Sequence, residues 1–82
     1  MERTAINIKL TEIFRKVFNN NSLDLRDELT ANHVDNWDSL THMLLIAEIE
    51  ASFQIKFKLR ELNRMRNVGD MVDLLTEKLS NQ

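Results

Sequence analysis

Residues 34–53 read VDNWDSLTHMLLIAEIEASF, a polar segment that changes at an Asp-Ser pair into a long apolar run. Short polar side chains accept the amide hydrogens that the first turn of a helix leaves unpaired. The pair therefore predicts an N-cap at Asp38 or Ser39 and a helix from about Ser39 to Phe53. Three roles are open to Ser39: the cap itself, a nucleophile, or a point of covalent attachment.

On a helical wheel of about 100° per residue, this helix has two apolar stripes. The stripe expected to face the core consists of His42, Leu45, Ile46, Ile49 and Phe53. The opposite stripe consists of Leu40, Met43, Leu44, Ala47 and Ala51, with Glu48 and Glu50 on its flanks. Both stripes are buried if the helix is central in a bundle. Because a small core buries one stripe more readily than two, we favour a second stripe that is partly exposed and docks partners.

The rest of the chain predicts three further helices around this one. Apolar residues at three- and four-residue spacing indicate a first helix over roughly Thr4–Phe18, which the asparagine run after it ends. Residues 59–65 predict one or two helical turns. Apolar positions from Val68 to Leu79 predict a final helix that begins near Asn67 or Gly69.

Between the first two predicted helices lies a long polar loop, roughly Asn19–Asp38. Its apolar residues are Leu23, Leu25, Leu29, Val34 and Trp37. Structureless loops of this length are uncommon in small domains, so we expect the loop to pack on the core. A short helical turn is expected near Leu25–Thr30.

The composition supports a helical fold. The 82 residues include no proline and one glycine, which disfavours an all-β fold with many tight turns. We therefore predict an all-α domain spanning residues 1–82: a small four-helix bundle with three main helices, a short third helix and a long loop between helices one and two.

Several classes of protein are disfavoured by what the chain lacks. It has no cysteine, which excludes disulfides and thiolate metal sites and fits the reducing cytoplasm. No uninterrupted apolar run suits a signal peptide or a membrane span, so we expect a cytoplasmic protein with no membrane association.

The formal net charge of −2 is mild, but the charges are unevenly distributed. From residue 24 to 50 the acids are Asp24, Asp27, Glu28, Asp35, Asp38, Glu48 and Glu50, against the single base Arg26. From residue 51 to 66 the bases are Lys56, Lys58, Arg60, Arg64 and Arg66, against the single acid Glu61. These regions are either two solvated faces or an acidic docking surface beside a basic one.

A serine nucleophile needs a base within hydrogen-bond reach and an oxyanion hole. His42 follows Ser39 by three residues and could approach it on one helix face. However, the chain lacks the Gly-x-Ser-x-Gly elbow and has little room for a substrate pocket. A phosphate ester suits the position better, because free amides and the positive end of the helix dipole stabilise phosphate. The segment therefore favours a serine that another enzyme modifies.

Metal and nucleic-acid sites are weaker hypotheses. The possible metal ligands close in sequence are His33, Asp35, Asp38 and His42. Their spacing matches no zinc motif, and the glycine of a calcium loop is absent. The basic stretch near Arg60–Arg64 is short and has no helix-turn-helix glycine turn. We expect neither a metal site nor nucleic-acid binding.

Asp38-Ser39-Leu40, after a long loop and before an apolar helix that ends in Phe53, resembles the attachment site of acyl carrier proteins. The triplet alone is a weak motif. Trp37 before it and the fourteen-residue interval from Ser39 to Phe53 make it strong. The resemblance covers nearly the whole chain, with the predicted helices in the family's order and spacing.

The resemblance implies that a phosphopantetheinyl transferase esterifies Ser39 with 4'-phosphopantetheine from coenzyme A. The terminal thiol of this arm would carry an acyl or aminoacyl group as a thioester. Asp38 would help recruit the magnesium used in the transfer. The implied docking residues are Leu40, Met43, Leu44, Ala47, Glu48 and Glu50. The chain would be no enzyme but a monomeric carrier, loaded by a ligase and served by synthase or acyltransferase enzymes.

The sequence departs from the fatty-acid carriers of this family. Leu44 and Ala51 stand where acids are common, Lys56 stands where proline is frequent, and the region of the third helix is basic. Together with Trp37, these departures point to a specialised or peptidyl-type carrier. The alternative is a helical interaction module that is never modified, in which Ser39 is only an N-cap.

Overall fold

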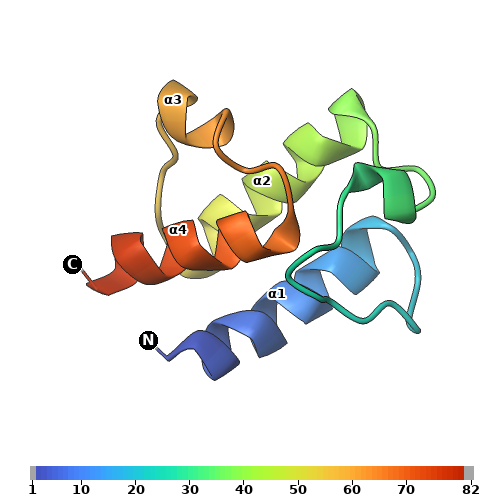
Figure 1. Ribbon diagram of the computed structural model, residues 1–82, viewed down its shortest axis with the longest axis horizontal. Helices are drawn as coiled ribbons and strands as arrows, with labels where there is room; N and C mark the ends of the chain where they lie inside the picture. Colours follow the sequence, from blue (N-terminus) through green and yellow to red (C-terminus); the bar gives the residue numbers. More distant parts are fainter. Residues whose placement is uncertain (1, 81–82) are drawn as a thin grey trace.

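The computed structural model describes residues 2–80. Within these residues the secondary structure is all helical and contains no strand. The elements are α1 (Arg3–Val17), the 3-10 helix η1 (Ala31–His33), α2 (Ser39–Phe53), α3 (Leu59–Leu62) and α4 (Val68–Ser80). Figure 1 shows the long helices α1, α2 and α4, the short α3 and the long loop that joins α1 to α2. The predicted all-α class with a short third helix is confirmed.

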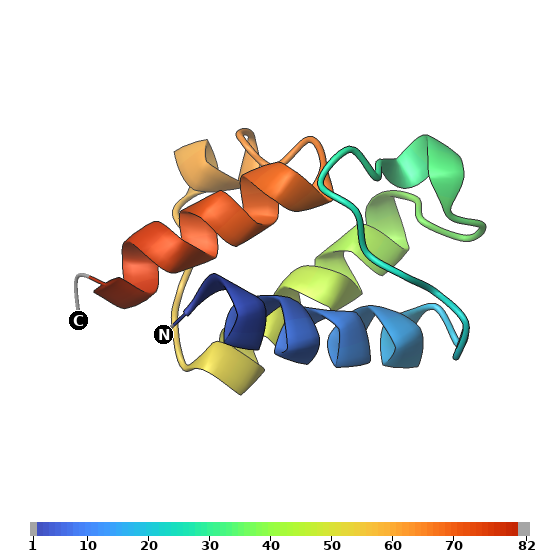
Figure 2. The same ribbon diagram turned by 60° about the horizontal axis from the view of Figure 1, so that its bottom comes forward.

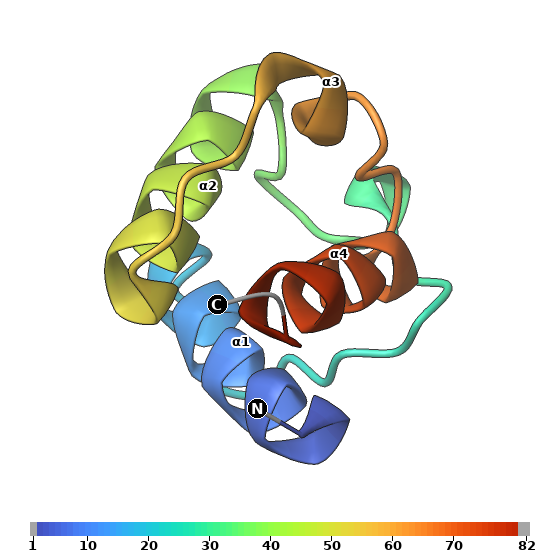
Figure 3. The same ribbon diagram turned by 90° about the vertical axis from the view of Figure 1, so that its left-hand side faces the viewer.

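Helix α1 packs against both α2 and α4, as Figure 3 shows from the side. Its buried face is the predicted apolar one: Ile6, Leu10, Ile13 and Phe14. The residues that meet this face from α4 include Met71, Val72 and Leu75, all fully buried. One core therefore lies between the three long helices, and it holds α2 from one side only.

Two helix ends depend on backbone that favours glycine but here carries amide side chains. α1 ends at Val17, one residue before the predicted end, and Asn19 after it has φ 51°. α2 ends at Phe53 as predicted, and its C-cap Gln54 has φ 55°. Asparagine tolerates this left-handed geometry well, so the predicted stop at the asparagine run is confirmed.

The long loop packs on the core, as its leucines and tryptophan predict. Leu29, Val34 and Trp37 are buried, and the other two apolar residues of the loop are half-buried against the same cluster. The predicted helical turn at Leu25–Thr30 is wrong, because the short helix lies at Ala31–His33. Its position is set by Thr30, whose Oγ1 accepts from the Asn32 amide and whose own amide donates to His33 Nδ1.

The middle of the loop is also bonded to the start of α4, which it passes closely in Figure 2. The Val68 N–H donates to the Leu29 carbonyl at 3.0 Å, and the Gly69 N–H donates to the Asp27 carbonyl at 2.8 Å. A Cβ on Gly69 would lie 3.1 Å from that same Asp27 oxygen, so a side chain there would require the loop to move slightly. These loop carbonyls thus accept amides that the first turn of α4 would otherwise leave unpaired.

The end of the loop is fixed by an aromatic cluster of Phe14, Phe18 and Trp37. The Trp37 ring meets Phe14 edge-on at 5.3 Å between centroids, and its centroid lies 5.7 Å from that of Phe18. Such pairs contribute about 0.5–1.5 kcal/mol each beyond their burial. Because Trp37 is anchored in this way, the two residues after it, Asp38 and Ser39, have a defined place at the top of α2.

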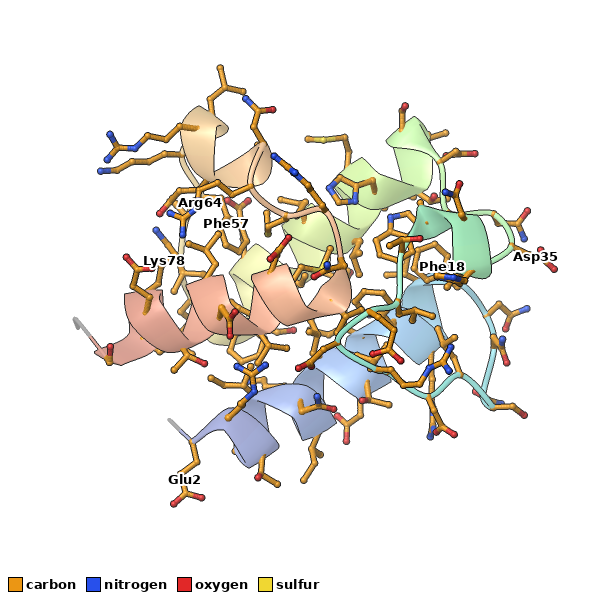
Figure 4. All side chains as sticks on the ribbon, in the orientation of Figure 1. Glu2, Phe18, Asp35, Phe57, Arg64 and Lys78 are labelled. Carbon is orange, nitrogen blue, oxygen red and sulfur yellow. The ribbon has the colours of Figure 1, made fainter. Side chains whose placement is uncertain are left out.

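Side chains rather than extensive helix packing hold α3 in place. Figure 4 shows Phe57, Arg64 and Lys78 gathered between α3 and α4. Lys78 Nζ lies 3.0 Å from Glu61 Oε1 and 5.8 Å from the Phe57 ring centroid. The Lys58 amide and the Lys78 ammonium both bind the Glu61 carboxylate and lower its pKa. This link ties α3 to α4.

Within residues 2–80, no helix combines the length and apolar character needed to cross a lipid bilayer.

Candidate functional site

Asp38 is the N-cap of α2. Its Oδ1 accepts hydrogen bonds from the Leu40 and Thr41 amides, each at 3.0 Å. The Asp38 amide in turn donates to Thr41 Oγ1 at 2.8 Å, which completes a capping box. The Thr41 and Leu40 hydrogen bonds lower the pKa of the Asp38 carboxyl, so it is a carboxylate at neutral pH. Of the two predicted caps, the structure selects Asp38.

Ser39 is the first residue of α2, and its side chain is exposed. Since Asp38 caps the helix, the Ser39 hydroxyl is not needed for the cap. In the described part of the chain no hydrogen bond joins Ser39 to His42, whose Nδ1 is occupied by Trp37. The pair therefore lacks the nucleophile–base contact that serine hydrolysis requires. What remains is an accessible hydroxyl with no base hydrogen-bonded to it among residues 2–80.

His42, expected on the core stripe, is half-buried. The Trp37 indole N–H donates to His42 Nδ1 at 3.0 Å, and the two rings are nearly parallel, with centroids 6.1 Å apart. Nδ1 must carry no proton in order to accept this bond. Burial also lowers the pKa of His42 from its ordinary value of 6.5. The imidazole is therefore neutral at pH 7 and serves to orient the aromatic cluster.

This pair predicts a pH effect on folding. Because the folded-state pKa of His42 lies below 6.5, its contribution to stability is complete above that pH and is lost as the pH falls through the lower value. We expect the fluorescence of Trp37, the sole tryptophan, to be quenched over the same range as the imidazolium forms. The measurement is fluorescence and thermal unfolding of wild type and His42→Gln from neutral pH downward. A wild-type transition centred above 6.5, or one retained in His42→Gln, would contradict the assignment.

Ser39 stands at the rim of a hollow of about 520 Å³. Its lining comes from the loop, the start of α2 and the segment before α4: Ala31, Trp37, Asp38, Ser39, His42, Met43, Met65 and Arg66. A larger hollow of about 680 Å³ lies at the other end of α2, near Gln54. Fifteen residues of helix separate Gln54 from Ser39, roughly 22 Å, so it is not part of the same site.

An exposed serine hydroxyl beside a largely apolar hollow fits a serine-linked phosphodiester arm. The hydroxyl is reachable by an enzyme, and the adjoining hollow offers apolar surface to the organic part of the arm. Among residues 2–80, no group of three or more histidine, aspartate or glutamate side chains is placed to hold a metal ion. The possible ligands that are close in sequence, His33, Asp35, Asp38 and His42, are therefore not brought together as a metal-binding group in this part of the chain.

The second stripe of α2 is exposed. Leu40, Met43 and Leu44 keep 72%, 54% and 55% of their surface accessible, and Ala47 and Ala51 are exposed as well. The core stripe of Leu45, Ile46, Ile49 and Phe53 is buried. Of the two interpretations of the wheel, the helix buried on all sides is wrong. The exposed residues Leu40, Met43, Leu44, Ala47 and Ala51 are called the α2 stripe below.

The two carboxylates that flank the α2 stripe have intramolecular partners. Glu48 Oε2 lies 3.3 Å from Lys16 Nζ of α1. Glu50 Oε2 accepts the Phe57 N–H at 2.8 Å and so supports the turn into α3. Sequence reasoning missed both contacts, because each joins residues on different elements. The face that α2 presents is consequently apolar, with both flanking acids engaged by the fold.

These two contacts predict unequal effects on stability. Glu50→Ala is expected to lower the free energy of unfolding by about 1–2 kcal/mol, because the half-buried Phe57 amide loses its acceptor. Glu48→Ala should cost less than about 0.5 kcal/mol, because its ion pair with Lys16 is solvent-exposed. Urea unfolding of both variants measures the difference, and equal costs would contradict it.

The comparisons with known proteins agree with this site. A family model described as "Phosphopantetheine attachment site" matches residues 8–75. The solution NMR structure of a holo acyl carrier protein from Geobacter metallireducens superimposes with a TM-score of 0.87 at 48% sequence identity. That match covers 92% of this chain and 86% of the other. A search of curated proteins finds no match.

The family model spans most of the chain, and the structural match is close in both sequence and shape. Carriers of this kind bear a covalent 4'-phosphopantetheine arm, interact with phosphopantetheinyl transferase and with synthase or acyltransferase enzymes, and catalyse no reaction themselves. The chain therefore belongs to the phosphopantetheine attachment family and is an acyl carrier protein.

Proposed function

We propose that Ser39 is the residue that carries the 4'-phosphopantetheine arm, on which an acyl or aminoacyl group travels as a thioester. The observation that carries the proposal is that two different residues at the start of α2 provide the helix cap and the exposed hydroxyl. Asp38 caps the helix through two amides, which leaves the Ser39 hydroxyl exposed at the rim of the hollow. This geometry speaks against the alternative in which Ser39 is only an N-cap.

Ser39 acts as the acceptor in the loading reaction. Its Oγ forms a bond to the phosphorus that bears the pantetheine group of coenzyme A. The bond from that phosphorus to the departing adenosine 3',5'-bisphosphate breaks, and the hydroxyl proton passes to a base of the transferase. Since no base among residues 2–80 is hydrogen-bonded to the Ser39 hydroxyl, we assign the activation to the partner enzyme.

Asp38 is proposed to help hold the magnesium ion used in this transfer. Its Oδ1 is occupied by the two amides of the cap. Its Oδ2 has no hydrogen bond from any residue of the described chain, and the side chain is exposed. A carboxylate oxygen is the ligand that magnesium prefers, and its ionised state at neutral pH fits the role.

The α2 stripe is proposed as the surface on which partner enzymes dock. It begins directly beside Ser39, and its leucines and methionine are too exposed to be core. Contiguous apolar surface of this kind marks interaction sites, and methionine suits surfaces that meet several partners. Glu48 and Glu50 are predicted for docking as well. Each also has a partner within the fold, so only the part of each carboxylate that this partner leaves accessible can meet a partner enzyme.

Finer features of the carrier follow from this surface. The α2 stripe must be free to meet a loading ligase and then a synthase or acyltransferase, so we infer a monomer that acts as one domain over residues 1–82. The apolar α2 stripe and the basic residues around α3 support a specialised or peptidyl-type carrier. A cysteine-free chain is compatible with the cytoplasm.

Intact-protein mass spectrometry tests the proposal. The purified chain is incubated with coenzyme A, magnesium and a broad-specificity phosphopantetheinyl transferase, next to an acyl carrier protein of proven reactivity. We expect one phosphopantetheine to be added, and fragmentation to place it on Ser39. Modification of another residue, or none while the reference carrier is modified, would overturn the assignment of Ser39.

A further inference from the structure

Arg66 lines the same hollow as Ser39, although 27 positions separate them in the chain. The other residues around the hollow are largely apolar, and its two remaining titratable groups carry no positive charge at neutral pH. His42 is neutral because burial lowers its pKa. Asp38 is a carboxylate whose Oδ1 is already bonded to the α2 amides. Arg66 is therefore the one permanent cation among the lining residues.

The backbone of Arg66 is held in a defined place. The residue before it, Met65, is buried with 7% of its surface accessible. The Arg66 amide donates to Asp70 Oδ2 at 3.3 Å, and the Asp70 amide donates to Asn67 Oδ1 at 2.8 Å. These two hydrogen bonds join residues 66 and 67 to Asp70 in the first turn of α4. The Arg66 side chain therefore starts from a fixed point in the wall of the hollow.

The guanidinium of Arg66 has no carboxylate partner within residues 2–80, unlike several other arginines of the chain. Arg3, Arg15 and Arg64 each lie within 4 Å of an aspartate or glutamate oxygen. Asp70 Oδ2 accepts a hydrogen bond from the Arg66 backbone amide and not from its guanidinium. The Arg66 charge is thus available to an anion that comes from outside the chain.

Attachment of the arm to Ser39 places such an anion at the hollow. The phosphodiester carries one negative charge, and its two non-bridging oxygens match the paired N–H donors of a guanidinium. We propose that Arg66 is the positioning residue for the arm, pairing with the phosphodiester on Ser39 and holding the arm along the wall formed by Met43 and Met65. This inference rests on the proposed attachment at Ser39.

Phosphorus NMR of the loaded carrier tests the pairing without any partner enzyme. The wild type is compared with Arg66→Gln and with Arg60→Gln, which removes an exposed arginine of α3 that does not line the hollow. We expect the ³¹P chemical shift to move and the line to narrow in Arg66→Gln alone. Salt raised from about 0.01 M to about 1 M should bring the wild type toward this variant, because the screening length falls from about 30 Å to about 3 Å.

A second measurement uses the wild type only. The side-chain Nε–Hε resonance of Arg66 is recorded before and after loading, and it should move more than that of Arg60. Identical ³¹P signals in wild type and Arg66→Gln, or an Arg66 resonance indifferent to loading, would overturn the pairing. A carrier whose mass shows that nothing was added to Ser39 yields no phosphodiester signal, and that outcome overturns the proposed attachment itself.

Discussion

Replacing Ser39 with alanine is expected to abolish phosphopantetheine transfer while leaving the folded domain unchanged. The substitution removes only the hydroxyl group. The cap of α2 remains, because Asp38 accepts its two hydrogen bonds from backbone amides without the Ser39 side chain. An alanine in the first turn of a helix carries no penalty in helix propensity. Mass spectrometry after incubation with transferase measures the loss, and thermal unfolding should agree with the wild type within about 0.5 kcal/mol.

The stability measurement separates the two interpretations of Ser39. An N-cap serine lost to alanine costs about 0.5–2 kcal/mol. A drop of that size in Ser39→Ala would show that the hydroxyl supports the helix after all. Asp38→Ala is the matched control, because it removes the cap observed in the structure and should show such a cost. Residual transfer to the Ser39→Ala protein would locate the attachment elsewhere.

The second large effect is expected in the core stripe of α2. Ile49 is fully buried, and Ile49→Ala should lower the free energy of unfolding by about 2–5 kcal/mol through lost burial and the cavity left behind. Domains of this kind have about 5–15 kcal/mol in total, so the variant will be marginally folded. Denaturant unfolding measures the change.

Leu40→Ala is the matched substitution on the α2 stripe. Leu40 is 72% exposed and its stability should change by less than about 0.5 kcal/mol, while transfer by the phosphopantetheinyl transferase should slow. If Leu40→Ala destabilised the fold as much as Ile49→Ala, the α2 stripe would be core and could not dock partners. If transfer were as fast as in the wild type, the stripe would have no part in transferase recognition.

The sequence alone predicts the helices well, since periodic apolar residues and few helix breakers determine them locally. The exposure of the α2 stripe is harder to predict from the sequence. A helical wheel shows two apolar faces but does not show how many other helices cover them. In the structure α2 faces the core that it shares with α1 and α4, and no long helix covers its opposite face. The sequence does not locate the short helix of the loop correctly, because its cap, Thr30, differs little from the other polar residues of the loop.

The residues of the site also fall into those that the local sequence identifies and those that only the fold brings together. Asp38, Ser39 and the stripe after them lie on one element, and their local pattern is sufficient to find them. Met65 and Arg66 reach the hollow from a distant part of the chain, and no local signal marks them among the other basic residues near α3. The contacts of Glu48 with Lys16 and of Glu50 with the Phe57 amide likewise depend on tertiary packing.

The two hydrogen bonds from the start of α4 to the long loop have a consequence for local unfolding. The Val68 and Gly69 amides donate to carbonyls of the loop, so they become open to solvent when the loop lifts. Their hydrogen exchange therefore reports detachment of a segment that lies far from them in sequence. That segment leads directly to Trp37 and Ser39. A partner that displaces the loop between α1 and α2 would therefore speed hydrogen exchange at the first turn of α4. Deuterium uptake at these two amides would reveal such a partner from a site that it does not contact.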